Sequence, residues 1–202
     1  DLYRPYKQKR RTRGSIAREK GLEPLAEAIF AQDGQDPQML ARDYVDPEKG
    51  VNTVEEALQG ANDIIAENLS DDADIRKALR QLVMRRGTFT CKAAEDADED
   101  GVYRLYYDFC QPIPRLLDHQ ILAINRGEKE GILKPAVTLT GNEGAALVCR
   151  SALKPTAQVS AFVRTAAEDA YDRLIFPAIQ REVRNELSDR AYAGAIANFA
   201  LN

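Results

Sequence analysis

The sequence predicts a mainly α-helical fold with a small β excursion near its middle. Apolar residues recur at helical spacing over most of the chain, and capping residues precede several of these periodic stretches. One short region instead concentrates β-branched and aromatic residues. We therefore expect a multi-helix core, with a β-hairpin or extended excursion near residues 88–107 and a candidate strand near residues 132–140.

The first part of the chain carries the start and stop signals of short helices. Thr12 or Ser15 can cap the first helix, and Gly21 can end it. Proline in the first turn of a helix costs little, because its missing N–H would have no helical partner there. We expect helices at residues 16–20, 22–31 and 36–44.

Two longer helices are predicted next. Thr53 and Glu56 have the spacing of a capping box, in which a hydroxyl and a carboxylate satisfy the first free amides. The helix that begins there is expected to reach about residue 69. A second amphipathic pattern predicts another helix over residues 71–86.

The middle of the chain has a different composition. Residues 88–93 and 102–107 are rich in strand-forming types and flank an acidic turn, which predicts a hairpin. Residues 112–118 have the composition of a linker into a helix at residues 119–125. In the last part, helical spacing returns, Pro177 is expected to interrupt it, and Ser188 to cap a final helix. These signals divide the chain into residues 1–87, 88–145 and 146–202.

Composition narrows the class of protein. The chain has 202 residues, of which 44% are apolar and 30% charged, so it can bury a core. It contains no apolar run of membrane-spanning length and no visible signal peptide. Three widely spaced cysteines favour a reducing, cytoplasmic setting over a disulfide framework. Because the chain begins with Asp1 rather than Met, we expect it to be a piece of a longer protein.

The most informative feature for function is a basic segment at the start of the chain. The first twenty residues hold eight basic and two acidic side chains, so their formal charge is about +6, against −4 for the whole chain. Such a segment usually meets phosphate or an acidic protein surface. The alternatives are phosphate contact, with tyrosines stacking on bases, and pairing of the arginines with acidic residues of the body. The candidate nucleic-acid-binding residues are Tyr3, Tyr6, Lys7, Lys9, Arg10, Arg11 and Arg13, with Arg126 from a second, weaker patch.

Three other patterns resemble chemical motifs but lack essential parts. Residues 96–101 copy the first half of a calcium loop, yet Tyr107 stands where the bidentate glutamate should close it. His119 is the only histidine and has no sequence neighbour that would make a zinc or nucleophile arrangement. The glycines at 127, 131 and 144 do not form a phosphate loop. We therefore expect no catalytic residue, metal ligand, cofactor or small-molecule substrate.

Three segments, spread along the chain, together resemble one protein family. They are DLYRPYKQKRRTRGSIAREKGLEPLA at residues 1–26, ILAINRGEKEGIL at 121–133 and DAYDRLIFPAIQREVRNELSDRAYAGAIANFALN at 169–202. All three are similar to segments of the Tex family of bacterial transcription accessory proteins, in family order. The chain departs from the family pattern at two positions. Gln120 stands where the family often has arginine, and Gly14 replaces a common alanine.

The resemblance implies a helical fragment of a longer protein whose S1-type OB-fold, RNase-H-like domain and helix-hairpin-helix region lie outside these residues. It implies a non-enzymatic scaffold that positions RNA- or DNA-binding modules, with single-stranded nucleic acid favoured as the partner. The alternative is a protein-interaction scaffold that binds RNA polymerase or associated transcription factors without touching nucleic acid. A membrane partner is not expected.

Overall fold

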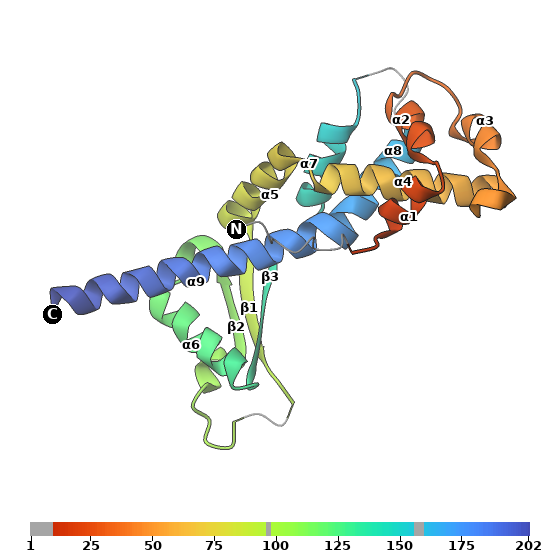
Figure 1. The fold of residues 1–202 in the computed structure, drawn as a ribbon. Helices are drawn as coiled ribbons and strands as arrows, with labels where there is room; N and C mark the ends of the chain where they lie inside the picture. The colour runs from red at the N-terminus through yellow and green to blue at the C-terminus, as the bar shows by residue number, and fades with distance from the viewer. Residues whose placement is uncertain (1–9, 96–97, 156–159) are drawn as a thin grey trace, which may run out of the picture. The chain divides into compact units, whose positions relative to one another are not determined.

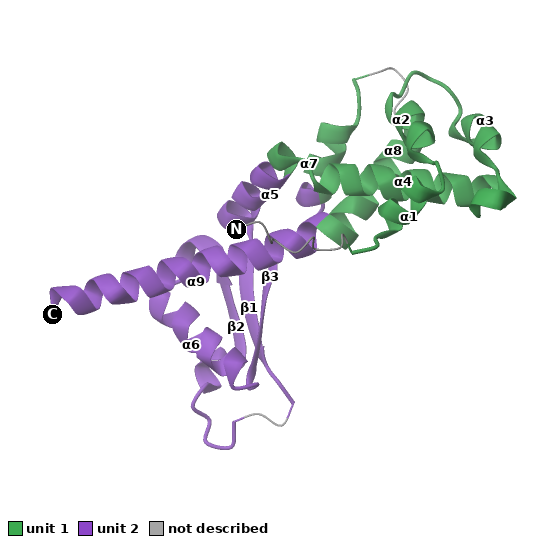
Figure 2. Cartoon of the chain, in the orientation of Figure 1, with its two compact units in different colours: residues 1–75, 145–174 green, residues 76–144, 175–202 purple. Residues whose placement is uncertain are grey.

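The computed structural model describes residues 10–95, 98–155 and 160–202 (Figure 1). The chain divides into two compact units (Figure 2). Unit 1 contains residues 1–75 and 145–174, and unit 2 contains residues 76–144 and 175–202. Because both units are built from separate stretches of the chain, each depends on contacts between residues far apart in sequence.

Unit 1 is helical, and α4 lies at its centre. Helices α1, α2 and α8 all pack against α4 (Figure 1). Short 3-10 turns at Arg42–Tyr44 and Pro47–Lys49 connect α3 to α4. The helices are α1 (Arg13–Glu19), α2 (Glu23–Phe30), α3 (Pro37–Ala41), α4 (Val54–Ser70), α8 (Ala161–Asp169) and most of α7 (Glu143–Ala152).

The predicted caps begin the helices of unit 1. The Ser15 amide donates to Thr12 Oγ1 at 3.1 Å, and the Thr12 amide donates to Ser15 Oγ at 2.8 Å, so the two residues cap each other. At α4 the Glu56 amide donates to Thr53 Oγ1 at 3.1 Å. The Glu56 carboxylate accepts from the Asn52 amide rather than from that of Thr53. The start of α4 at Thr53 is therefore confirmed. Of the two caps considered for the first helix, Thr12 is the one used, so α1 begins at Arg13, three residues before the predicted range of 16–20.

Small residues bring α1 and α4 close together. Gly60 lies in the interior of α4, and a Cβ added there would overlap the Leu22 side chain and approach the Ala17 Cβ to 3.3 Å. Ala17 and Leu22 are buried. The same core includes the large apolar side chains of Leu25, Ile29, Ile64 and Ile65. Glycine in a helix interior has a conformational cost, which close packing offsets here.

Unit 2 combines a three-stranded antiparallel sheet with helices. The strand order is β2-β1-β3, with Phe89 of β1 opposite Gln111 of β2 and Val137 of β3. Helices α6 and α9 pack on each other and on β3 (Figure 1). The elements are most of α5 (Ala73–Arg86), then β1 (Thr88–Ala93), β2 (Asp108–Pro112), α6 (Asp118–Lys129), β3 (Leu133–Thr138) and α9 (Phe176–Leu201).

The predicted hairpin is present, but its second strand begins later than expected. Residues 102–107 were expected to pair with residues 88–93, whereas β1 pairs with Asp108–Pro112 and Arg104–Tyr106 forms a 3-10 turn. The Asp98 carboxylate accepts hydrogen bonds from the Tyr103 amide at 2.7 Å and the Tyr107 hydroxyl at 2.8 Å. These bonds hold the loop in a compact turn. The candidate strand near residues 132–140 is confirmed as β3.

The expected break at Pro177 and cap at Ser188 are wrong, because α9 continues through both residues. Pro177 occupies the first turn of α9, directly after a π-helical segment at Ala170–Ile175. That wider turn gives the proline ring room, and the first turn needs no N–H. The Ser188 hydroxyl instead accepts a hydrogen bond from Asn125 Nδ2 at 3.0 Å. Fully buried residues then recur at every fourth position, namely Ile175, Ile179, Val183, Leu187 and Ala191.

Within the part of the chain that the structure describes, no helix is both long enough and apolar enough to cross a bilayer.

Candidate nucleic-acid interface

The structure places three of the predicted arginines around the start of α1. Arg10 and Arg11 immediately precede this helix and Arg13 is its first residue, and all three are exposed. Tyr3, Tyr6, Lys7 and Lys9 lie outside the described residues. The chain therefore brings Arg10, Arg11 and Arg13 together at one end of a short helix of unit 1.

The charge of Arg11 is only weakly compensated. Its guanidinium lies 3.1 Å from the Glu19 carboxylate, but these side chains are 72% and 62% exposed. An exposed ion pair contributes about 0–1 kcal/mol and is screened by salt. Arg11 can therefore exchange Glu19 for another anion at little cost.

Arg13 differs from the other two because its charge also acts on the interior of the unit. Hydrogen bonds from Arg173 hold the pKa of Asp169 below its usual value, and the positive charge of Arg13 lowers that pKa further. Arg173 donates to the two Asp169 oxygens at 3.3 and 3.0 Å. Arg13 is therefore partly balanced inside unit 1.

Contacts on the inner face of α1 fix how it presents these cations. Gly14 and Ala17 are buried. Arg18 donates from Nη2 to Asn68 Oδ1 of α4 at 2.7 Å, and its Nε lies 3.7 Å from the Glu23 carboxylate. Because Arg18 is held by these partners, it is not counted among the candidate contacts.

Two lysines that sequence reasoning did not select come together in the same unit. The two lysines each reach toward the glycine that follows the other. Lys49 Nζ lies 3.6 Å from the position that a Cβ on Gly21 would occupy. Lys20 Nζ lies 3.9 Å from the position that a Cβ on Gly50 would occupy. Both glycines have positive φ, 79° and 81°, at the ends of short helices. Over residues 10–95, 98–155 and 160–202, neither lysine has a carboxylate within 4.0 Å.

We call Arg10, Arg11, Lys20 and Lys49 the cationic surface of unit 1. Lys20 belongs to the basic run that the sequence shows, whereas Lys49 is preceded by Glu48 and carries no such signal. The fold of the chain through the Pro47–Lys49 turn places the Lys49 ammonium near Gly21, the residue after Lys20. Sequence spacing alone could not have found it.

Arg126 belongs to unit 2 and has acidic surroundings. It lies on α6 and lines an open hollow of about 500 Å³. The acidic residues that line the same hollow are Asp98, Glu99, Asp100 and Glu130. These carboxylates would oppose a phosphate, and the contact of Arg126 with nucleic acid stays a prediction.

The second and third family-like segments pack against each other in unit 2. Arg184 of α9 donates to Asn125 Oδ1 at 2.9 Å and to the Glu128 carboxylate at 2.7 Å, both on α6. Its guanidinium also lies 5.4 Å from the centre of the Phe89 ring, a cation–π distance. These segments therefore hold α6, α9 and the sheet together.

The other residues singled out from the sequence have local roles. Asp98 accepts hydrogen bonds within its own loop, as described above, and Asp96 lies outside the described residues. His119 is exposed in the first turn of α6. In the described part of the chain, no group of three or more histidine, cysteine or acidic side chains is arranged to hold a metal ion. Burial raises the pKa of the Cys91 thiol to about 11.

The fold and this surface define a class: a mainly helical protein with cations at both ends of one short helix. Comparison with known proteins gives the family. The model of the family described as "Tex central region-like" matches residues 32–199, and the chain belongs to that family. The predicted family resemblance is therefore confirmed.

Similar proteins occur in bacteria and in humans. The chain is 44% identical over 206 residues to YdcI of Bacillus subtilis, covering 100% of this chain and 29% of that protein. It is 29% identical over 210 residues to the transcriptional accessory protein Tex of Neisseria gonorrhoeae, covering 100% and 27%. It is 28% identical over 216 residues to human S1 RNA-binding domain-containing protein 1, covering 98% and 21%. The chain thus spans less than a third of the length of these relatives.

Proposed function

We propose that this chain is a non-catalytic, helical part of a transcription accessory protein and that it contacts single-stranded RNA or DNA. The cationic surface of unit 1 supplies the phosphate contacts. Lys7, Lys9 and Arg13 of the basic segment add phosphate contacts, and Tyr3 and Tyr6 stack on bases. The helices hold this surface in a fixed relation to the core of unit 1.

The observation that carries this proposal is the exposure of the cations. Arg10 and Arg11 are exposed, and among the described residues Arg11 pairs with a carboxylate, that of Glu19, which is itself exposed. Lys20 and Lys49 each approach the glycine that follows the other lysine, and among the described residues neither has a carboxylate within 4.0 Å. This arrangement favours a polyanion over an internal salt-bridge network.

The names of relatives agree with this proposal. One relative is named a transcriptional accessory protein and another carries an S1 RNA-binding domain in its name. Since this chain covers only a part of each, nucleic-acid contact by these particular residues is our own inference.

The test is the salt dependence of binding. A fluorescent single-stranded 12-nucleotide RNA is titrated with the chain at several salt concentrations, using wild type, Arg10→Ala/Arg11→Ala and Lys20→Ala/Lys49→Ala. Each phosphate contact to a single strand contributes about −0.7 to the slope of log affinity against log salt. Each double variant is therefore expected to reduce the slope by about 1.4.

The matched control is Arg181→Ala/Arg190→Ala, which removes two exposed arginines from α9. Its slope should equal that of the wild type. Equal slopes for all four proteins would exclude the cationic surface as the binding site.

The alternative, a scaffold that binds RNA polymerase or an associated factor, is favoured by a different observation. Tyr192, Ile196 and Phe199 are 54%, 70% and 87% exposed on α9, and no residue from Ala191 to Asn202 is charged. Exposed apolar surface of this kind often marks a protein-binding site. Binding of the chain to purified RNA polymerase, lost in Tyr192→Ser/Phe199→Ser, together with no RNA binding at low salt, would favour this alternative.

A further inference from the structure

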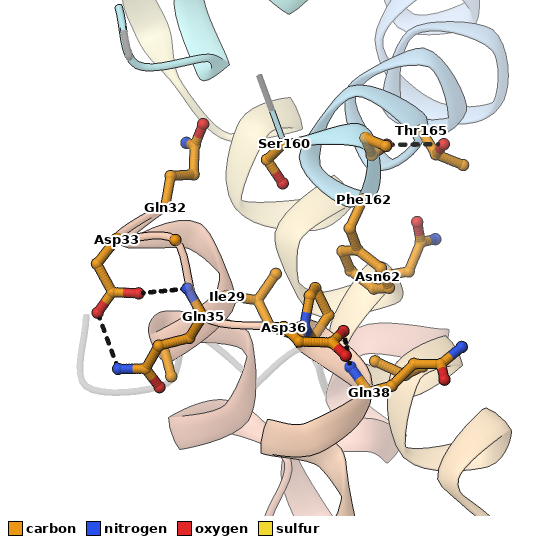
Figure 3. A pocket seen from close by; sticks show the side chains of 15 residues that line it. Ile29, Gln32, Asp33, Gln35, Asp36, Gln38, Asn62, Ser160, Phe162 and Thr165 are labelled. Atoms are coloured by element: carbon orange, nitrogen blue, oxygen red, sulfur yellow. Dashed lines mark hydrogen bonds between the residues drawn. The ribbon is translucent and has the colours of Figure 1, made fainter. Parts of the chain in front are cut away.

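A hollow of about 550 Å³ opens in unit 1, away from the cationic surface. The end of α2, the loop that follows it, the start of α3, the middle of α4 and the start of α8 form its walls (Figure 3). Its size is within the range of small-molecule sites, which is about 300–1,000 Å³. It is large enough for one planar heterocycle.

The apolar part of the hollow centres on Phe162. This ring is only partly buried, and it projects from α8 towards Asn62 of α4 and the start of α3 (Figure 3). Ile29 and Leu58 line the hollow beside it. A half-exposed aromatic ring in an apolar setting offers a face on which a flat ligand can stack.

The polar part is rich in carboxamides that have unused hydrogen-bonding groups. Asn62 donates from Nδ2 to Asp169 at 3.2 Å, and its Oδ1 accepts no hydrogen bond from the described residues. Gln38 has its backbone amide bonded to Asp36, but its side-chain amide makes no hydrogen bond with the described residues. Gln32, by contrast, ties the wall together through bonds to Ala152 at 2.9 Å and from Lys154 at 3.1 Å.

The charge of the lining limits what the hollow can bind. Among the described residues, no lysine or arginine lines it. The carboxylates of Asp33 and Asp36 do line it, and both accept hydrogen bonds from backbone amides of the adjoining turns. A phosphate would therefore be repelled. An uncharged ring with amino groups and acceptors on its edge fits better, because carboxamides pair with such an edge.

We propose that this hollow is a subsite for one unstacked nucleobase, with adenine preferred. The base stacks on Phe162, and its edge bonds to the Gln38 carboxamide and to Asn62 Oδ1. Glutamine and asparagine present a donor and an acceptor in the arrangement that adenine complements. The inference rests on the proposed function, because the strand that supplies the base is held by the cationic surface.

The two sites lie on different sides of α4. Gly60 faces α1, whereas Leu58 and Asn62 line the hollow, and two residues along a helix differ by about 200°. A strand that engages both must pass around α4. A preference for adenine is therefore expected with a 12-nucleotide RNA and absent with a 4-nucleotide RNA.

The experiment compares two labelled 12-nucleotide RNAs, all uridine and uridine with central adenines, by fluorescence anisotropy. The variants are Phe162→Ala and Gln38→Ala, with Phe199→Ala as the control for loss of an exposed ring. Phe162→Ala should weaken binding of the adenine-containing RNA about tenfold, since a stacked base has about this effect. Gln38→Ala should reduce the preference for adenine severalfold, and the salt slope should not change in either variant.

The outcomes separate this inference from the proposed function. If Phe162→Ala and Gln38→Ala bind both RNAs like the wild type while Arg10→Ala/Arg11→Ala weakens both, the subsite is refuted and the phosphate surface stands. If the wild type binds neither RNA, both proposals fail. Gln38 is exposed, and its side chain makes no hydrogen bond with the described residues. Gln38→Ala is therefore expected to fold, so it can test the subsite even if Phe162→Ala does not fold.

A third arm distinguishes a strand from a free nucleoside as the source of the base. Adenosine alone is titrated into the wild type and into Phe162→Ala. Adenosine binding as tight as that of the RNA, and lost in Phe162→Ala, would overturn the strand subsite and assign the hollow to a free nucleoside. Adenosine binding that is weak or absent supports the strand.

Discussion

The start of α1 in unit 1 and the contact of α6 with α9 in unit 2 use arginine in opposite ways. In unit 2, Arg184 turns inward, where Asn125, Glu128 and the Phe89 ring neutralise and cover it. In unit 1, Arg10 and Arg11 turn outward at the start of α1. Both regions belong to family-like segments that contain arginine. The difference teaches that a basic residue in such a segment indicates a ligand contact only when its charge is left uncompensated by the fold.

The largest difference between the two regions is expected when one arginine is removed from each and the loss of stability is compared. Arg184→Ala is expected to lower the free energy of unfolding by about 2–3 kcal/mol, because it leaves the Asn125 and Glu128 side chains of α6 without the hydrogen bonds from Arg184. Arg11→Ala should change it by less than about 0.5 kcal/mol, as expected for an exposed site. Urea unfolding followed by circular dichroism measures both.

Arg181→Ala is the control for loss of an arginine from α9, and it should behave like Arg11→Ala. Equal losses of stability for Arg184→Ala and Arg181→Ala would show that the contacts of Arg184 do not stabilise the fold.

The second test concerns the sign of a glycine substitution. An alanine in a helix interior normally stabilises by about 0.5–1 kcal/mol relative to glycine. Gly60→Ala should instead destabilise unit 1 by about 1–2 kcal/mol, because the new Cβ meets Leu22 and Ala17 in the packed core. Thermal unfolding gives the sign directly.

Gly194→Ala on α9 is the contrasting variant. Its Cβ would meet only the Asp118 carboxylate, the end of a flexible side chain that can move aside. This variant should be neutral or stabilising. If Gly60→Ala also stabilises, α1 does not approach α4 as closely as described.

The third test uses pH. Because hydrogen bonds from Arg173 depress the pKa of Asp169 in the folded state, its carboxylate contributes stability above its unfolded pKa of about 3.9. That contribution is lost as the pH falls through the folded value. Asp169→Asn should therefore cost about 1 kcal/mol at pH 7. The gap from wild type should narrow below about pH 4.

The measurement is the free energy of unfolding of both proteins at pH 7 and at pH 3. A gap that stays constant between these two values would mean that Asp169 is not held as an anion by Arg173.

The smallest expected effect is that of Glu19→Ala. The exposed pair with Arg11 contributes little, so stability should change by less than about 0.5 kcal/mol. Removing one negative charge beside the cationic surface should raise RNA affinity slightly, by no more than about threefold at low salt. Asp189→Ala in unit 2 is the matched control and should leave affinity unchanged. A clear loss of affinity in Glu19→Ala would contradict the proposed role of Arg11.

The features that sequence reasoning predicted correctly depend on near neighbours in the chain. Thr12, Thr53 and the residues before α5 cap their helices through residues two or three positions away. The hairpin boundary was misplaced because the Asp98 bonds to Tyr103 and Tyr107 override the strand preference of those residues. The break at Pro177 was misjudged because the π-helical segment before it is not visible in residue spacing.

The candidate sites divide in the same way. Arg10 and Arg11 belong to a run of basic residues that is visible in the sequence. Lys49 becomes relevant only through its approach to Lys20, and Phe162 only through its place beside Asn62 and the loop after α2. Such approaches depend on tertiary packing, which a single sequence does not display.

The every-fourth-residue spacing of the buried positions on α9 has a mechanical consequence. Four residues advance about 400° around a helix, so the line from Ile179 to Ala191 turns by about 40° at each step and by roughly 120° in all. The apolar seam of α9 is thus a right-handed thread rather than a straight edge. A helix seated on a thread cannot slide along its axis without also rotating, so any displacement of α9 in its seat must be a screw motion.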